Sequence, residues 1–329
     1  MRKFSILIPI LMIFATMLMS QIKFEPSMVK QSKVSKETNK IFSRNRRFSC
    51  LIEYSLGNSE YIPINRFILK NKSGETIYEK TQLKHTLIDI SNNGEIVGID
   101  YDGPISGKAG LHFYNREGVE IGTNSVGFLL ERCFSTKSNV YCINDGNSGL
   151  RVFKLNGEEL YNLGKCNWFS VSFDGNYIAV TQDTEIILFE QDNQISRIPL
   201  SSPFIRQIKF SEDGSLLGFI DRKSIYLYSI LEQKIIFQYN EQNNKLEFTS
   251  FDIALDNSAI ILGLAEDKGR GMPDRHTRGY VYFFDMSGEL HWKGEIRFNK
   301  WNAYIPRVSF TGSCTFKVIT VNDIYEYQF

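Results

Sequence analysis

The sequence predicts an all-β protein made of repeated four-stranded antiparallel sheets, and two observations carry this prediction. First, residues 169–198 and 205–239 repeat one pattern: an apolar run, a turn containing Asp174-Gly175 or Asp213-Gly214, a second apolar run and two further alternating runs. Asp-Gly between apolar runs is a strong hairpin signal, because tight turns need residues that tolerate positive φ. Second, these stretches show no 3.6-residue apolar period of the kind that helices produce.

The repeat extends in both directions, and its spacing indicates the kind of unit. A period near ~40 residues is that of a four-stranded propeller blade. Residues 48–329 therefore predict a β-propeller domain of seven blades, with six as the open alternative. The first turns of successive units, in steps of 43, 38, 39, 43 and 55 residues, fall at Gly94, Lys137, Gly175, Gly214, Asn257 and Gly312.

The first twenty residues have the layout of a secretory signal. Arg2 and Lys3 precede an apolar run over residues 4–19. We expect a cleaved signal and an exported chain that is periplasmic, secreted or envelope-associated. An uncleaved anchor, with membrane association through residues 4–19, and cytoplasmic residence are the alternatives.

Residues 21–47 differ in composition from the rest of the chain. They contain eight Lys or Arg against Glu25 and Glu37, with few large apolar side chains. Such a segment buries too little apolar surface to offset its ordering entropy, which predicts a flexible basic linker. Attraction to anionic lipid or another polyanion is the alternative.

The repeat region itself is acidic. Residues 48–329 contain 28 Lys or Arg against 35 Asp or Glu, a net charge of −7, so we expect no nucleic-acid partner.

The first apolar run of the repeat region, residues 48–54, has no obvious strand to pair with. This run either completes the last blade or begins the first.

The repeat resembles known propeller families. The stretches SFDGNYIAVTQD and FSEDGSLLGFID resemble the turn-plus-strand signature of YVTN and WD40-like β-propellers, and VYFFDMSGELHW resembles the hairpins of quinoprotein-type repeats. The resemblance covers about 85% of the chain. It implies a propeller architecture and no particular activity.

An aspartate recurs at the end of the second strand of each unit. Equivalent positions in a radial repeat lie at equivalent places about its axis, so we expect these carboxylates to share one face. Either each Asp bonds its own turn backbone, or the set holds a cation, for which carboxylates suit calcium. No other cofactor is expected. The residues are Asp100, Asp145, Asp183, Asp221, Asp267 and Asp323.

Two long loops follow these aspartates, at residues 101–110 and 266–279. Long loops on a rigid scaffold often carry binding residues, although a solvated insertion explains them equally well. The second loop contributes the candidates Arg270, Asp274, Arg275 and His276, of which His276 beside Asp274 suits a general base only inside a pocket.

The remaining cysteines and histidines give weaker signals. Cys133 and Cys142 lie symmetrically about a turn, so they either face each other and form a bridge in an oxidising compartment or are two apolar strand residues. The four His are scattered without a pair at ligand spacing, which does not indicate zinc.

These observations favour a non-catalytic binding or scaffolding propeller for a protein or a small extracytoplasmic ligand. Whether the chain is an enzyme stays open. One alternative is a metal-dependent lactonase-like or other hydrolase with its site at the propeller axis. Another is a structural component tethered to the cell envelope.

Overall fold

The computed structural model describes residues 26–33, 40–43, 46–54, 63–81, 84–101, 108–127, 129–135, 137, 140–266, 278–297 and 305–329. The described residues contain strands and turns and no helix. Within this part of the chain, no segment meets the length and apolarity that a membrane-crossing helix needs. The strands form seven four-stranded antiparallel sheets, which confirms the predicted all-β class and the blade count of seven rather than six.

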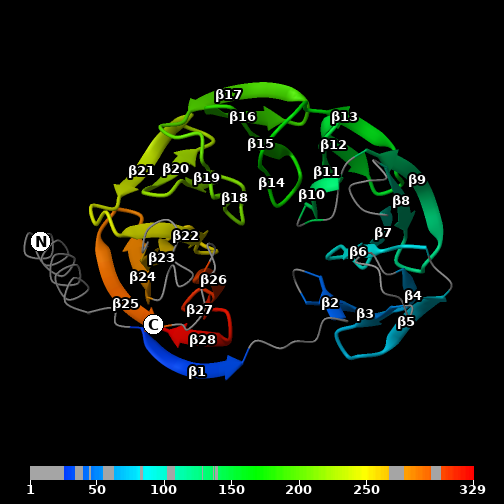
Figure 1. Cartoon of the computed structure of the whole chain (residues 1–329), viewed down its shortest axis with the longest axis horizontal. Helices are drawn as coiled ribbons and strands as arrows, with labels where there is room; N and C mark the ends of the chain where they lie inside the picture. Colours follow the sequence, from blue (N-terminus) through cyan, green and yellow to red (C-terminus); the bar gives the residue numbers. More distant parts are fainter. Residues whose placement is uncertain are drawn as a thin grey trace, which may run out of the picture. The chain divides into compact units, whose positions relative to one another are not determined.

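The chain divides into two compact units, and the larger one, Ser35–Gln238, contains five consecutive sheets (Figure 1). In each of them the four strands follow one another in sequence order, as a meander does. The strands are β2 (Lys40–Phe42), β3 (Phe48–Tyr54), β4 (Ile64–Asn71) and β5 (Thr76–Thr81); β6 (Leu87–Ile90), β7 (Ile96–Tyr101), β8 (Ala109–Tyr114) and β9 (Glu120–Val126); β10 (Leu129–Phe134), β11 (Val140–Asp145), β12 (Gly149–Lys154) and β13 (Glu159–Asn162); β14 (Phe169–Val171), β15 (Tyr177–Gln182), β16 (Glu185–Glu190) and β17 (Asn193–Pro199); β18 (Gln207–Phe210), β19 (Leu216–Ile220), β20 (Ser224–Ser229) and β21 (Lys234–Asn240).

The core of this unit lies between neighbouring sheets. Each of four buried apolar clusters draws side chains from two successive sheets, so the sheets pack face against face. In the third sheet every residue of β11 is buried, whereas the fourth strand, β13, is mostly exposed. This difference in burial explains why second strands such as β11 are continuous apolar runs in the sequence. Fourth strands, which are more exposed, alternate apolar and polar residues.

The second unit, Met1–Val34 with Tyr239–Phe329, contains two sheets. They pack through a cluster that includes Ile261, Phe283, Phe316 and Val318. One sheet consists of β22 (Leu246–Ile253), β23 (Ala259–Glu266), β24 (Arg278–Asp285) and β25 (Leu290–Arg297), and the other of β26 (Arg307–Gly312), β27 (Thr315–Ile319) and β28 (Asp323–Gln328), completed by β1 (Ser27–Lys33).

The place of β1 corrects two predictions from the sequence. β1 pairs antiparallel with β28, so the strand that completes the last sheet lies in the segment expected to be a flexible linker (Figure 1, blue and red). Residues 48–54 neither complete that sheet nor begin the first one. They form β3, the second strand of the first sheet, which follows β2. Met28 and Val29 are 53% and 55% exposed. Backbone pairing therefore holds β1 in place, and composition, which reports apolar burial, could not reveal it.

Candidate functional site

The described aspartates occupy the places in the repeat that the sequence predicted. Asp100 and Asp145 lie at the end of the second strand of a sheet in the larger unit, and Asp183 and Asp221 directly follow such a strand. Asp323 begins β28 in the smaller unit. Five further candidates, Asp267, Arg270, Asp274, Arg275 and His276, lie outside the described residues, and their predicted role stays a prediction.

Three of these aspartates lie in different local settings. Asp221 is buried, and its Oδ1 accepts hydrogen bonds of 2.7 Å from the backbone N–H groups of Lys223 and Ser224. Asp183 is exposed and has a φ of 49°, a conformation that Asp tolerates better than most residues. Asp323 accepts a hydrogen bond from Gln31 on β1. The bonds of Asp221 fit the turn interpretation, whereas that of Asp323 joins two strands that are distant in sequence.

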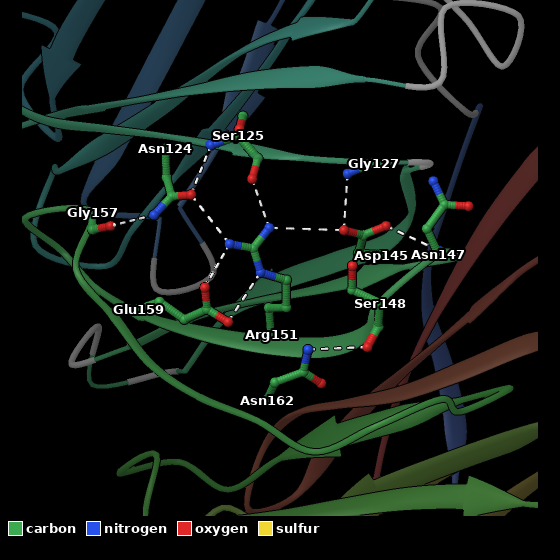
Figure 2. A network of polar contacts seen from close by, with 10 residues as sticks. All are labelled: Asn124, Ser125, Gly127, Asp145, Asn147, Ser148, Arg151, Gly157, Glu159 and Asn162. Atoms are coloured by element: carbon green, nitrogen blue, oxygen red, sulfur yellow. Dashed lines mark hydrogen bonds and ion pairs between the residues drawn. The ribbon is translucent and has the colours of Figure 1, made fainter.

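Asp145 differs, because its carboxylate is 1% exposed and is the centre of a polar network (Figure 2). One oxygen accepts from the N–H of Gly127 at 2.9 Å, and the other accepts from the N–H of Asn147 at 3.0 Å. Arg151 Nη1 lies 3.8 Å from the same carboxylate. The negative charge of Asp145 is thus held by fixed donors, as a buried charge requires.

Arg151 connects this carboxylate to the neighbouring sheet. Its guanidinium donates to the carbonyl of Ser125 at 2.6 Å and to Asn124 Oδ1 at 3.2 Å, both on β9 (Figure 2). It also donates to both carboxylate oxygens of Glu159 on β13, at 3.1 and 2.6 Å. A planar guanidinium with five donors suits such a junction. The network therefore connects β9 of one sheet to β12 and β13 of the next, close to the turn that follows Asp145.

Next to Asp145, a pocket of about 520 Å³ opens between the sheets β10–β13 and β14–β17. Two of the predicted residues, Asp145 and Asp183, line it together, whereas Asp100 and Asp221 do not. Most of the lining side chains carry amide or carboxylate groups. The lining residues are Leu130, Asn144, Asp145, Gly146, Gly149, Lys165, Cys166, Asn167, Thr181, Gln182 and Asp183.

The wall formed by residues 165–167 is held from both sheets. Gln182 Nε2 donates to the carbonyl of Lys165 at 2.7 Å, and Asn144 Nδ2 donates to the carbonyl of Cys166 at 3.1 Å. Gly149 has a φ of 97°, and a Cβ at this position would lie 2.1 Å from the backbone of Gly164. Only glycine permits this approach. The pocket is therefore built on fixed backbone rather than on loose loops.

The one thiol among the described lining residues, that of Cys166, is partly buried. Burial, together with the charge of Glu131, raises the pKa of the Cys166 thiol to about 12, so the thiol stays protonated at neutral pH. Burial also raises the pKa of Glu131 itself. The described residues that line the pocket include no Ser–His pair of the kind common in hydrolases.

A second group of polar side chains surrounds Asp100 and was missed in the sequence. His85 Nδ1 lies 2.6 Å from Asp100 Oδ1, and His112 Nε2 lies 3.2 Å from Asp100 Oδ2. The spacing of the histidines along the chain gave no sign of this convergence, which the fold creates. Partial burial raises the pKa of Asp100, but the hydrogen bond from His85 and the two imidazoles outweigh burial and lower it overall.

The cysteine prediction is confirmed in its geometry, since Cys133 and Cys142 are direct cross-strand partners on β10 and β11. Burial first, and then the charge of Cys133, raise the pKa of the Cys142 thiol well above its ordinary value. Whether the two sulfurs are joined in the cell stays a prediction.

The fold and the sheet topology define a seven-bladed β-propeller of WD40-like architecture. The chain is similar to Hsv2 from Kluyvelomyces marxianus, with a TM-score of 0.57 at 9% identity over 86% of this chain and 88% of that one. A KlHsv2 variant with loop 6CD replaced by a Gly-Ser linker gives 0.59 at 9% identity, over 88% and 89%. A structure described as the eukaryotic initiation factor gives 0.57 at 10% identity, over 80% and 66%.

At these identities the similarity shows the fold alone. No protein-family model matches the sequence, and no curated protein matches it.

Proposed function

We propose that the protein is a non-catalytic binding module and that its ligand enters the pocket between the sheets β10–β13 and β14–β17. The observation that carries this proposal is the combination of a fixed polar wall with lining groups that include both hydrogen-bond donors and hydrogen-bond acceptors. Concave sites with a few convergent polar groups are the usual places of ligand recognition.

The lining groups indicate the chemistry of the ligand. Asp145 is already neutralised by Arg151 and two backbone donors, so it shapes the wall rather than attracting a cation. Lys165, Asn167 and Asp183 are exposed in the pocket and supply both donors and acceptors. Such a set suits a polar segment of a partner protein, whose peptide groups offer a donor and an acceptor at each residue.

The compartment belongs to the proposal as well. The basic start and apolar run of residues 1–20 support export, so the ligand is met outside the cytoplasm. Mass spectrometry of the mature chain tests this part. A mature N-terminus near Gln21 supports cleaved export, and a chain that still begins at Met1 contradicts it.

Site-specific photo-crosslinking in the cells that produce the protein tests the binding site. A photoreactive amino acid replaces Gln182, at the pocket end of β15, and a matched control replaces Asn176, next to the other end of the same strand. Intact-mass analysis of the purified chain detects adducts of any size. The proposal predicts a defined adduct from position 182 and none from position 176.

Adducts at position 176 alone, equal adducts at both positions, or no adduct at position 182 would contradict the proposed site.

A further inference from the structure

Asp100 lies between two histidines that come from different parts of the second sheet of the larger unit. His85 precedes β6, Asp100 lies near the end of β7, and His112 lies within β8. Cross-strand pairing of Gly98 with His112, and of Asp100 with Gly110, places Asp100 and His112 on the same face of the sheet. His85 packs over that face, because its ring lies directly above Gly98.

The three side chains converge closely enough to share an ion. Their potential ligand atoms all lie within 4.8 Å of one another. The imidazole centroids are 4.9 Å apart. His85 is 4% exposed, whereas His112 and Asp100 are 27% and 31% exposed, so the cluster is buried on one side and reaches solvent on the other.

Each imidazole has an oxygen partner for its second nitrogen. His85 Nε2 lies 2.8 Å from the hydroxyl of Tyr114, and His112 Nδ1 lies 3.4 Å from a carboxylate oxygen of Glu120. Metal-binding histidines have this arrangement, in which the distal N–H donates to a carboxylate or other oxygen while the facing nitrogen binds the ion. The outer oxygens can therefore accept from the distal N–H groups in the tautomers that a metal requires.

The surroundings hold the first histidine in place. The backbone carbonyl of His85 accepts a hydrogen bond from the N–H of Ile64, on the neighbouring sheet, at 2.6 Å. Tyr114 is itself buried and packs edge-on against Phe67, with ring centroids 6.4 Å apart. Preorganised ligands lose little freedom on binding, which favours affinity.

We propose that His85, Asp100 and His112 bind a first-row transition-metal dication such as Zn²⁺, with solvent completing the coordination. Two imidazoles and one carboxylate suit Zn²⁺, whereas Ca²⁺ and Mg²⁺ prefer oxygen ligands alone. A tetrahedral ion with bonds of about 2.0–2.2 Å needs its ligand atoms ~3.3 Å apart. The facing atoms, at 2.6 and 3.2 Å, need only a small outward shift.

Binding changes where the protons of neutral imidazoles lie. The proton between His85 and Asp100 moves to the nitrogen that faces Tyr114, and that between His112 and Asp100 moves to the nitrogen that faces Glu120. Each ring thus exchanges one neutral tautomer for the other, and the carboxylate gives up two hydrogen bonds for one ionic bond. Glu120 then accepts a hydrogen bond and makes the His112 ligand more basic.

A similar group in the smaller unit provides the control. Asp285, Glu289 and His291 also converge, but Asp285 Oδ1 already accepts from the N–H groups of Ser287 and Glu289 and from the Ser287 hydroxyl in a hairpin turn. This carboxylate serves the turn, and the group has a single imidazole. His291→Gln therefore removes a histidine without touching the proposed site.

The test is a titration of the untagged, chelator-treated full chain with Co²⁺, followed by displacement with Zn²⁺. The proposal predicts one equivalent of Co²⁺ with visible absorption bands of a nitrogen-ligated ion, lost on addition of Zn²⁺. His112→Gln abolishes the bands and His291→Gln leaves them unchanged. Glu120→Gln keeps one site but weakens it by about 10–100-fold. His112 and Glu120 are partly exposed, so both variants are expected to fold.

Circular dichroism confirms folding of each variant before titration. No saturable binding by the folded wild type, or equal binding by wild type and His112→Gln, would overturn the proposal. Equal affinities of wild type and Glu120→Gln would contradict the outer role of Glu120.

Discussion

The buried carboxylate of Asp145 lies 3.8 Å from the guanidinium of Arg151, at the link where the third sheet meets the pocket. The pair joins one wall of the pocket to β9 and β13, because Arg151 also bonds Ser125 and Glu159. Removing Arg151 leaves the buried charge of Asp145 without its ion-pair partner, which is costly. The shape of the proposed site therefore depends on this pair.

Asp145→Ala is expected to lower the free energy of unfolding by about 1–3 kcal/mol, because the backbone N–H groups of Gly127 and Asn147 lose their acceptor and Arg151 loses the ion pair. Asp183→Asn is the matched control, at an exposed position whose positive φ Asn also tolerates. Urea denaturation measures both. Equal losses in the two variants would show that the network around Asp145 is unimportant.

Gly98→Ala is expected to displace His85. The new Cβ would lie 2.4 Å from the Cδ2 and Nε2 atoms of that ring, which is buried and has little room to move. Overpacking of this kind costs about 1–3 kcal/mol. Gly110→Ala is the control, because its Cβ would meet Asp100 and His112 at ordinary contact distances, 3.5 and 3.6 Å. Thermal unfolding compares them, and a Gly98→Ala variant as stable as Gly110→Ala would refute the packing described for His85.

Acidification is expected to weaken the hairpin of Asp285. Partial burial raises the pKa of this carboxyl, but bonds from Ser287, His291 and the N–H of Glu289 outweigh it and lower the pKa to about 2. A pKa below the unfolded value of about 3.9 stabilises the fold above pH ~4, and this contribution is lost as the pH falls toward 2. The stability difference between wild type and Asp285→Asn should shrink over that interval. The carboxylate is one-third exposed, so the change is modest. A difference that stays constant from pH 5 to pH 2 would contradict the assignment.

Removal of β1 is expected to expose the edge of β28. A chain that begins at Val34 should melt at a lower temperature and associate as its concentration rises, because an open strand edge pairs with other chains. A chain that begins at Pro26 retains β1 and serves as the control. Light scattering and thermal unfolding distinguish them. Identical behaviour of the two chains would contradict the pairing of β1 with β28.

Local turn chemistry made most of the fold predictable. Gly94, Gly175 and Gly214 all have positive φ at the predicted first turns, since a few consecutive residues encode such a turn. β1 was not predictable in this way. It pairs with a strand almost three hundred residues away, as the bond from Gln31 to Asp323 shows, and its exposed side chains leave no apolar pattern.

The site was predictable only where one residue carried the signal. Asp145 was a candidate because it recurs at the strand end, but its partner Arg151 was not, since nothing local marks an arginine that bonds a neighbouring sheet. Asp100 and His112 could have been placed on one face from the alternation of a hairpin once its register was known. The position of His85 is set by the segment that connects two sheets. Strand register does not predict where the residues of such a segment lie.

The most direct test of the proposed binding site is hydrogen–deuterium exchange of the purified chain with and without the partner isolated by crosslinking. We predict protection confined to residues 144–149, 165–167 and 181–183, the three segments that line most of the pocket. Protection of residues 174–176 and 213–215, at the opposite ends of their sheets, with unchanged exchange around the pocket, would contradict the proposal.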